Sequence, residues 1–260
     1  MKLATWNVNS LGARLPRVLE FLAEHSPDVV MLQETKCDDA AFPAAELALA
    51  GYDAVHHGSG RWAGVAILAR SGLGLGETVA GLPGELRAEE ARWIEASVAG
   101  MRVASVYVTN GREVDSEWFA EKLAFLDAIA ERVAAERGSP LVIAGDFNVA
   151  REDRDVYDPA AFLGATHVTA AERTRFERVL SDGALVDAYR LVHPDETQFT
   201  WWDYRQGHFH RDLGLRIDYI LVCEPIARGL AECSIARDYR KGKKPSDHAP
   251  LMAEVGAVPE

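Results

Sequence analysis

Acidic, amide and imidazole side chains recur where the apolar segments of this chain end. Segments such as 2–8, 28–33 and 141–144 each deliver one or more of these groups. Carboxylate and amide oxygens are ligands for hard cations such as Mg²⁺ or Mn²⁺, and a histidine beside a carboxylate can transfer protons near neutral pH. If the strands lie side by side, the groups converge on one metal-dependent or proton-transfer site. The candidate residues are Asn7, Asn9, Glu34, Asp146, Asn148, Asp218, Asp247 and His248.

The stretch 244–252 carries two of these groups, Asp247 and His248, between Pro245 and Pro250. Proline fixes φ and lacks a backbone donor, so a rigid loop is predicted here. For this stretch alone, a capped turn with one hydrogen-bonded histidine is the alternative. Each of the other groups could likewise serve a turn or a helix cap. Five such groups at strand ends together favour a shared site, and no cysteine or Gly-rich phosphate loop belongs to it.

Hydrophobic spacing predicts the elements that would position these groups. Short apolar or alternating runs predict strands over 2–8, 28–33, 64–69, 93–98, 101–108, 141–144, 199–204, 216–222 and 251–255. Helical spacing predicts helices over 15–25, 42–49, 117–137 and 171–180. A strand or turn is predicted at 186–189, and a long surface loop at 151–169. The mixed order favours a single domain over 1–260, an α/β sandwich of two packed mixed β-sheets flanked by helices.

Composition narrows the class of protein. The 260 residues are 48% hydrophobic, with no apolar run long enough for a membrane helix, so a cytoplasmic protein without a membrane partner is expected. Cys37, Cys223 and Cys233 have no paired spacing and fit reduced thiols. The net charge of −12 argues against a nucleic-acid binder. A local basic patch such as 237–244 could still contact phosphates beside an acidic metal site.

Five motifs, in order along nearly the whole chain, resemble those of the exonuclease III family of apurinic/apyrimidinic (AP) endonucleases. The motifs are Trp6-Asn-Val-Asn9, Leu32-Gln-Glu-Thr-Lys36, Gly145-Asp-Phe-Asn148, Leu215-Arg-Ile-Asp-Tyr219 and Ser246-Asp-His-Ala-Pro250. The resemblance implies the four-layer α/β sandwich of the endonuclease/exonuclease/phosphatase superfamily. It also implies base excision repair: cleavage 5′ to abasic sites in double-stranded DNA, with 3′→5′ exonuclease and 3′-phosphatase activity and Mg²⁺ or Mn²⁺ as cofactor.

The resemblance also implies roles for particular residues. Glu34 would be the main metal ligand, helped by Asn7 and Asp247. Asp146 would position or deprotonate the attacking water, and Asp218 would pair with His248. Tyr107 would be a further catalytic residue, and three residues would take part in both catalysis and metal binding: Asp146, Asn148 and His248.

DNA contacts are predicted from aromatic and basic residues. An apolar wall for the abasic sugar is expected from Phe176, Trp201 and Trp202, although aromatic residues at such positions can equally belong to the core. The expected polar DNA contacts are Asn9, Arg92, Asn110, Arg112, Arg205 and Lys244. The chain departs from the family pattern at Thr109 and Gly12, which could alter these contacts. The expected partner is double-stranded DNA with abasic sites or 3′ ends, bound by a monomer.

Two other functions compete with this one. A phosphatase acting on small or lipid phosphates, or a non-specific nuclease, would use the same fold, but Trp201, Trp202 and Arg205 favour a nucleic-acid site. A catalytically inactive DNA-binding adaptor is disfavoured by the complete set of catalytic residue types.

Overall fold

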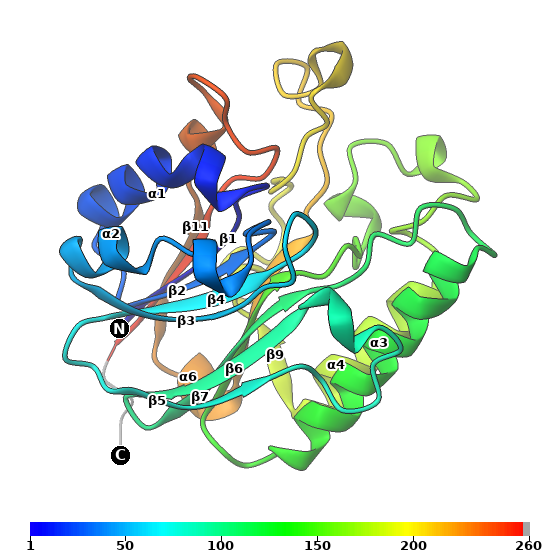
Figure 1. The fold of residues 1–260 in the computed structure, drawn as a ribbon. Helices are drawn as coiled ribbons and strands as arrows, with labels where there is room; N and C mark the ends of the chain where they lie inside the picture. Colours follow the sequence, from blue (N-terminus) through cyan, green and yellow to red (C-terminus); the bar gives the residue numbers. More distant parts are fainter. Residues whose placement is uncertain (257–260) are drawn as a thin grey trace.

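Two six-stranded β-sheets face each other, and helices cover the outer face of each (Figure 1). The computed structural model describes residues 1–256, so the last four positions of the predicted domain 1–260 lie outside the described residues. The first sheet, in strand order, is β11 (Leu230–Ile235), β12 (Leu251–Val255), β1 (Lys2–Asn7), β2 (Val29–Gln33), β4 (Val65–Arg70) and β3 (Tyr52–His57). The second is β5 (Leu75–Ala80), β6 (Trp93–Val98), β7 (Met101–Tyr107), β8 (Leu141–Asp146), β10 (Asp218–Cys223) and β9 (Leu185–Asp187).

The helices form the two outer layers. In Figure 1, α1 and α2 lie against the first sheet, and α3 and α4 lie against the second. This arrangement confirms the predicted α/β sandwich. The α-helices are α1 (Leu11–His25), α2 (Ala44–Leu49), α3 (Glu117–Ala135), α4 (Ala170–Gly183), α5 (Ala188–Val192) and α6 (Glu224–Ala227). Short 3₁₀ turns are η1 (Asp39–Ala41), η2 (Ala88–Glu90), η3 (Asp153–Asp155), η4 (Pro159–Phe162), η5 (Arg205–Gly207) and η6 (Arg237–Arg240). No helix within residues 1–256 has the length and apolar composition needed to span a membrane.

Central strands are buried on both faces, which explains their nearly continuous apolar sequences. Successive side chains of a strand point to opposite faces. In β1, Leu3 therefore belongs to the core between the sheets, whereas Ala4 and Trp6 belong to the core beneath α1. Phe21 and Leu22 of α1 complete that outer core.

Local capping signals set the helix boundaries. α4 begins with the predicted capping box, in which Thr169 and Glu172 each accept from the other's backbone N–H. α1 begins at Leu11, four residues before the predicted start, because the Ser10 hydroxyl accepts from the Ala13 N–H at 3.4 Å.

The strand predictions fail mainly at the sheet edges. The unpredicted strands β3, β5 and β11 are all edge strands. An edge strand is only partly covered and carries polar residues, so its sequence lacks a clear apolar run. The predicted strand at 199–204 is wrong. There Trp201 forms only isolated bridges, to Leu215 and His248, and the rest of the segment is irregular.

Candidate active site

The topology brings the polar strand ends to one edge of the sandwich. β1 and β2 are parallel, as are β7 and β8, and the hydrogen bond from Asn7 at the end of β1 to Asp146 at the end of β8 places both pairs of strand ends at the same edge. β8 and β10 are antiparallel, and their register places Asp146 opposite Asp218. Tyr107 lies opposite Asp146 on the other side of β8. The predicted convergence of groups distant in sequence is therefore found.

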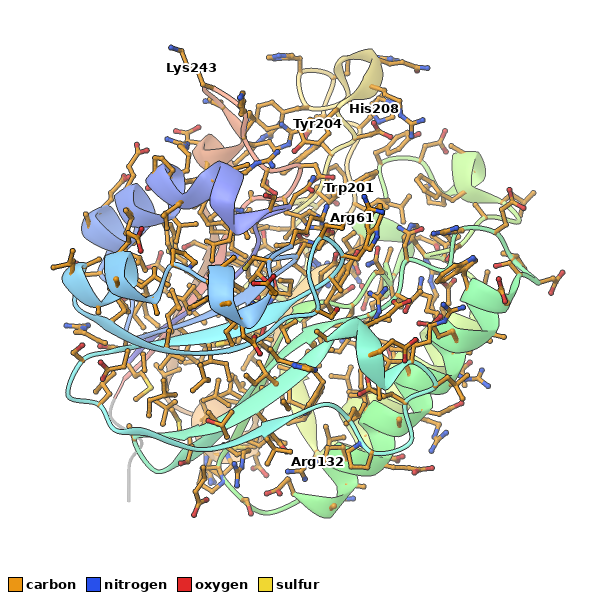
Figure 2. The ribbon with its side chains drawn as sticks, in the orientation of Figure 1. Arg61, Arg132, Trp201, Tyr204, His208 and Lys243 are labelled. Carbon is orange, nitrogen blue, oxygen red and sulfur yellow. The ribbon has the colours of Figure 1, made fainter. Side chains whose placement is uncertain are left out.

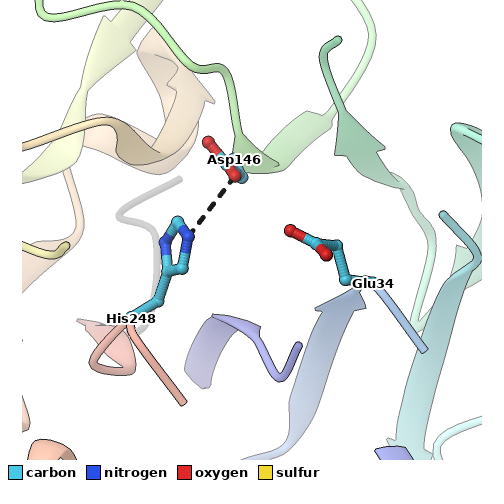
Figure 3. Close-up of side chains that lie close together, drawn as sticks. All are labelled: Glu34, Asp146 and His248. Atoms are coloured by element: carbon cyan, nitrogen blue, oxygen red, sulfur yellow. Dashed lines mark ion pairs between the residues drawn. The ribbon is translucent and has the colours of Figure 1, made fainter. Parts of the chain in front are cut away.

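Glu34, Asp146 and His248 form a cluster of metal-ligand type (Figure 3). One ligand atom from each lies within 4.8 Å of the others, and Asp146 and His248 are buried. The dashed line in Figure 3 marks the ion pair between His248 Nε2 and the Asp146 carboxylate, which lie 3.6 Å apart. Two carboxylates and one imidazole nitrogen are a suitable donor set for a divalent cation. The donor set therefore fits a metal ion, although it does not specify which one.

Polar neighbours hold the two carboxylates of this cluster. Asn7 donates from Nδ2 to Glu34 (2.8 Å) and to Asp146 (3.0 Å). Its own Oδ1 accepts from the Asn9 N–H, so Asn7 presents a donor, not the predicted ligand oxygen, to the carboxylates. Lys36 Nζ lies 2.7 Å from the second Glu34 oxygen. Glu34 is therefore held in place from both sides.

Asp218 and His248 form the predicted pair. His248 Nδ1 lies 2.8 Å from Asp218 Oδ2, and both side chains are almost fully buried. Burial acts to lower the pKa of His248, but the carboxylates of Asp218 and Asp146 outweigh it and raise the pKa to about 10. The imidazole is therefore charged near neutral pH. Its Nδ1 donates to Asp218, and its Nε2 lies near the Asp146 carboxylate.

Two further titratable groups of the site, the Asp146 carboxyl and the Tyr107 phenol, favour their neutral forms. Burial, with the charges of Asp218 and Glu34, raises the pKa of Asp146 to about 8, although His248 acts to lower it. Removal of Asp146 from water therefore outweighs the hydrogen bond that Asn7 donates to it. Burial and the Glu34 carboxylate also raise the pKa of Tyr107 well above its ordinary value, so its phenol stays protonated as a donor.

Backbone geometry explains two features of the motifs. A Cβ at Gly145 would lie 1.9 Å from the carbonyl oxygen of Val106 on the adjacent strand, so only glycine fits before Asp146. Glu34 and Asn148 adopt left-handed backbone conformations, with φ of 50° and 52°. Non-glycine residues rarely do so, and such strain concentrates at functional sites.

A cavity of about 380 Å³ opens beside the cluster. Trp201, Phe162 and Ile217 supply its apolar wall, and His167 lines it among the polar groups. Phe162 and His167 come from the segment 151–169, whose position the sequence did not predict. Asp155 anchors this segment because the buried Arg216 guanidinium donates to both of its carboxylate oxygens, at 2.8 and 3.1 Å.

Two of the predicted DNA contacts are wrong in this structure. Phe176 is 0% exposed and packs edge-on against Phe147, so it belongs to the core. Trp202 is also 0% exposed, and its indole donates to Asp212. The Arg92 guanidinium pairs with Glu90 and lies 4.7 Å from the centre of the Tyr107 ring, and Arg92 also lines a second cavity beside the first, so its contact with DNA stays a prediction.

The remaining predicted residues lie around the cavity. Asp247 lines it, but its oxygens accept from Asn9 Nδ2 (2.9 Å) and Trp201 Nε1 (3.0 Å), and it is not part of the metal-type cluster. Asn110, Arg112, Asn148 and Arg205 also line the cavity, and Arg205 pairs with Asp203. Lys244 is exposed outside the cavity lining. Figure 2 shows Tyr204, His208 and Lys243 on the loops that project above the sheets, at the opposite end from Arg132.

A second, larger cavity of about 810 Å³ adjoins the first. Glu34, Tyr107 and Arg112 line both cavities. The second adds Trp62, which is 67% exposed, and Trp118, whose ring lies 4.0 Å from the Arg112 guanidinium carbon. Sequence patterns did not identify either tryptophan. Trp62 lies in a polar loop and Trp118 in the first turn of α3, and neither carries a signal until the fold places it beside the site.

Comparisons with known proteins agree with this geometry. Residues 4–248 match the model of the Endonuclease/Exonuclease/phosphatase family. The chain is 32% identical to exodeoxyribonuclease III of Haemophilus influenzae, over 98% of this chain and 99% of that protein. The structure of the 3′ phosphatase NExo from Neisseria, bound to a product DNA hairpin, has a TM-score of 0.94 and 42% identity, and the match covers 98% of this chain and 99% of that one. An AP endonuclease from Archaeoglobus fulgidus has a TM-score of 0.93 and 36% identity, over 98% of this chain and 99% of that one. The chain therefore belongs to the endonuclease/exonuclease/phosphatase family, in its exonuclease III branch.

Proposed function

We propose that this protein is a metal-dependent DNA repair nuclease that hydrolyses the phosphodiester 5′ to abasic sites in double-stranded DNA. Exonuclease action at 3′ ends and removal of 3′ phosphates would use the same centre. The observation that carries this proposal is the joining of two features in one cavity. The metal-type cluster lies beside an apolar wall formed by Trp201, Phe162 and Ile217.

Glu34 and Asp146 are proposed to hold Mg²⁺ or Mn²⁺. His248 Nε2 lies within reach of the same position, but in the charged imidazole it carries a proton and is assigned to the phosphate instead. A divalent cation bound there supplies positive charge that offsets the charge on the phosphoryl oxygens and favours the ionised form of Asp146. Asn7 would keep the two carboxylates together. Asp247 is a weaker candidate because its oxygens already accept from Asn9 and Trp201.

The chemistry is assigned to the buried residues around the cluster. Asp146 would position and deprotonate the attacking water. Protonated Tyr107, charged His248 and the Asn148 side chain would donate to phosphoryl oxygens, where negative charge grows in the transition state. Asp218 would orient His248 and stabilise its charge.

Selectivity for damaged DNA would come from the size of the cavity. An abasic sugar presents no base, so it can enter a cavity of about 380 Å³ and contact Trp201 and Ile217. Moving a nucleotide out of the stack costs least when its base is missing. Arg112 and Arg205 at the cavity are proposed to contact phosphates, and the adjoining cavity with Trp62 would continue the path of the strand. We further propose that the protein acts as a monomer, with one copy bound at each abasic site or 3′ end of the DNA.

The test is incubation of a labelled duplex containing one synthetic abasic site with Mg²⁺ and then with excess EDTA. We expect a single nick 5′ to the site with Mg²⁺ and none after chelation. A duplex with an intact base at that position and the variant Glu34→Gln are the matched controls. Absence of a metal-dependent nick by the unmodified protein would contradict the proposal.

A further inference from the structure

One lysine of the chain is fully buried, and it lies directly behind the active site. Lys122 of α3 has a side chain that is 0% exposed. Its ammonium donates to the backbone oxygens of Asn148 (2.6 Å) and Asn110 (3.2 Å) and to the Thr166 hydroxyl (3.1 Å), and it pairs with the Glu172 carboxylate. Two of these four contacts are to the main chain of residues that line the cavity.

Asn148 needs such support because its backbone is strained. Its left-handed conformation (φ 52°) costs of the order of 1–3 kcal/mol and persists only where the surroundings impose it. The Asn148 carbonyl oxygen accepts from Lys122 Nζ and from His167 Nδ1, both at 2.6 Å. The Asn148 side chain is oriented in turn by Val108 and Asn110. The ammonium therefore fixes the peptide from which the proposed phosphate donor projects.

Glu172 extends the same network to the far wall of the cavity. Besides Lys122, its carboxylate accepts from the Thr166 hydroxyl (2.7 Å) and from the His167 backbone N–H (2.8 Å). It also accepts from Thr169 at the start of α4. One buried ion pair thus joins α3, α4, the end of the 151–169 segment and Asn148.

We infer that Lys122 is a positioning residue, whose buried ammonium sets the orientation of Asn148 for the reaction. This inference rests on the proposed function of the same site. The competing interpretation is that the Lys122–Glu172 pair only ties α3 to α4. A buried ion pair is often no more stabilising than apolar residues of the same volume, so helix packing alone does not require it.

Variants that remove the charges separate the two interpretations. Lys122→Met leaves the Glu172 carboxylate buried and unpaired, which should lower the unfolding midpoint strongly. The double variant Lys122→Met/Glu172→Gln carries neither charge, and the glutamine can still accept from Thr166 and His167. It should recover most of the lost stability. If Lys122 positions Asn148, kcat on the abasic duplex should nevertheless fall on the order of 10–100-fold, with KM nearly unchanged.

A matched control removes another ion pair of the same helix, Arg132 with Glu95, which lies away from the cavity. The double variant Arg132→Met/Glu95→Gln should keep the kcat of the unmodified protein. If the Lys122/Glu172 double variant also keeps it, the pair is only a tie between helices and the inference is overturned. Should that double variant not fold, Lys122→Met assayed well below its unfolding midpoint gives the same comparison.

A measurement without turnover keeps this test independent of the proposed function. The side-chain amide signals of Asn148 in a ¹H–¹⁵N NMR spectrum, assigned with Asn148→Asp, report the hydrogen bonds and surroundings of that side chain. They should shift in the Lys122/Glu172 double variant and stay in place in the Arg132/Glu95 one. Unmoved signals in both would overturn the inference even if the unmodified protein cleaved no abasic DNA.

Discussion

Replacing Asp146 with asparagine tests the proposed base most directly, because the change preserves shape and removes charge. In the structure, Asp146 accepts from the Asn148 N–H through Oδ1 (2.9 Å) and from Asn7 Nδ2 through Oδ2 (3.0 Å). Asparagine has only one oxygen, so one of these donors would face an NH₂ group. An unpaired buried donor costs about 1–3 kcal/mol of unfolding free energy. Asparagine has nearly the same volume and brings no charge into the buried site, so the variant should fold.

The effect on catalysis should be larger. General-base catalysis contributes about 10²–10⁴-fold, which at about 1.36 kcal/mol per tenfold is roughly 2.7–5.4 kcal/mol of barrier. We expect single-turnover cleavage of an abasic duplex to slow by that factor. Affinity for the same duplex, measured by fluorescence anisotropy, should be unchanged or higher, because a negative charge near the phosphate is gone. Asp127→Asn, which changes a carboxylate of α3 that pairs with Arg175 of α4, is the matched control. Cleavage by Asp146→Asn within threefold of normal would refute the assignment of the base.

Three further predictions follow from the same contacts. Arg216→Met should lower the free energy of unfolding by about 3–5 kcal/mol in urea, because Asp155 and Asp187 would both lose the buried guanidinium and Asp155 would keep only Arg190, whereas a loss under 1 kcal/mol would contradict this role of Arg216. Arg112→Ala should make the slope of log affinity against log salt shallower by about 0.9, from near −3.6 if four phosphates are neutralised, and an unchanged slope would mean that Arg112 contacts no phosphate. Burial acts to raise the pKa of Glu172, but Lys122 and hydrogen bonds lower it from 4.5 to about 2, so the pair's contribution to stability is present above pH 4.5 and is lost as the pH falls toward 2. Unfolding free energies between pH 5 and 3 should fall more steeply for the unmodified protein than for Glu172→Gln, and equal slopes would contradict this linkage.

Strands that are buried on both faces were predicted from the sequence more reliably than partly exposed ones. The central strands β1, β2 and β8 were predicted because burial on both faces forces nearly continuous apolar runs. The edge strands β3, β5 and β11 were missed because partial exposure allows mixed sequences. The capping box of α4 was readable from Thr169 and Glu172 because it involves only near neighbours in the chain.

Among the site residues, those within motifs were easier to predict than those brought in by packing. Glu34, Asp146 and His248 were identified because each ends or follows a strand in a recognisable motif. Phe162 and His167 were missed because their segment is irregular and is held in place by a buried contact to Arg216, more than 40 residues away in sequence. Phe176 and Trp202 were misassigned because an aromatic side chain has the same sequence signal in a core and in a pocket wall.

The sequence by itself determined the layered α/β class, the residue types at the strand ends and the family motifs, because hydrophobic periodicity and turn chemistry act between near neighbours. Only the tertiary structure decided that the Asn7 amide nitrogen faces the carboxylates, that the Arg92 guanidinium packs against the Tyr107 ring, and that burial raises the pKa of Asp146 to about 8. It also brought Lys122 behind Asn148. Hydrogen-bond orientation and desolvation depend on groups that are distant in the chain and meet only when the two sheets and their helices pack together.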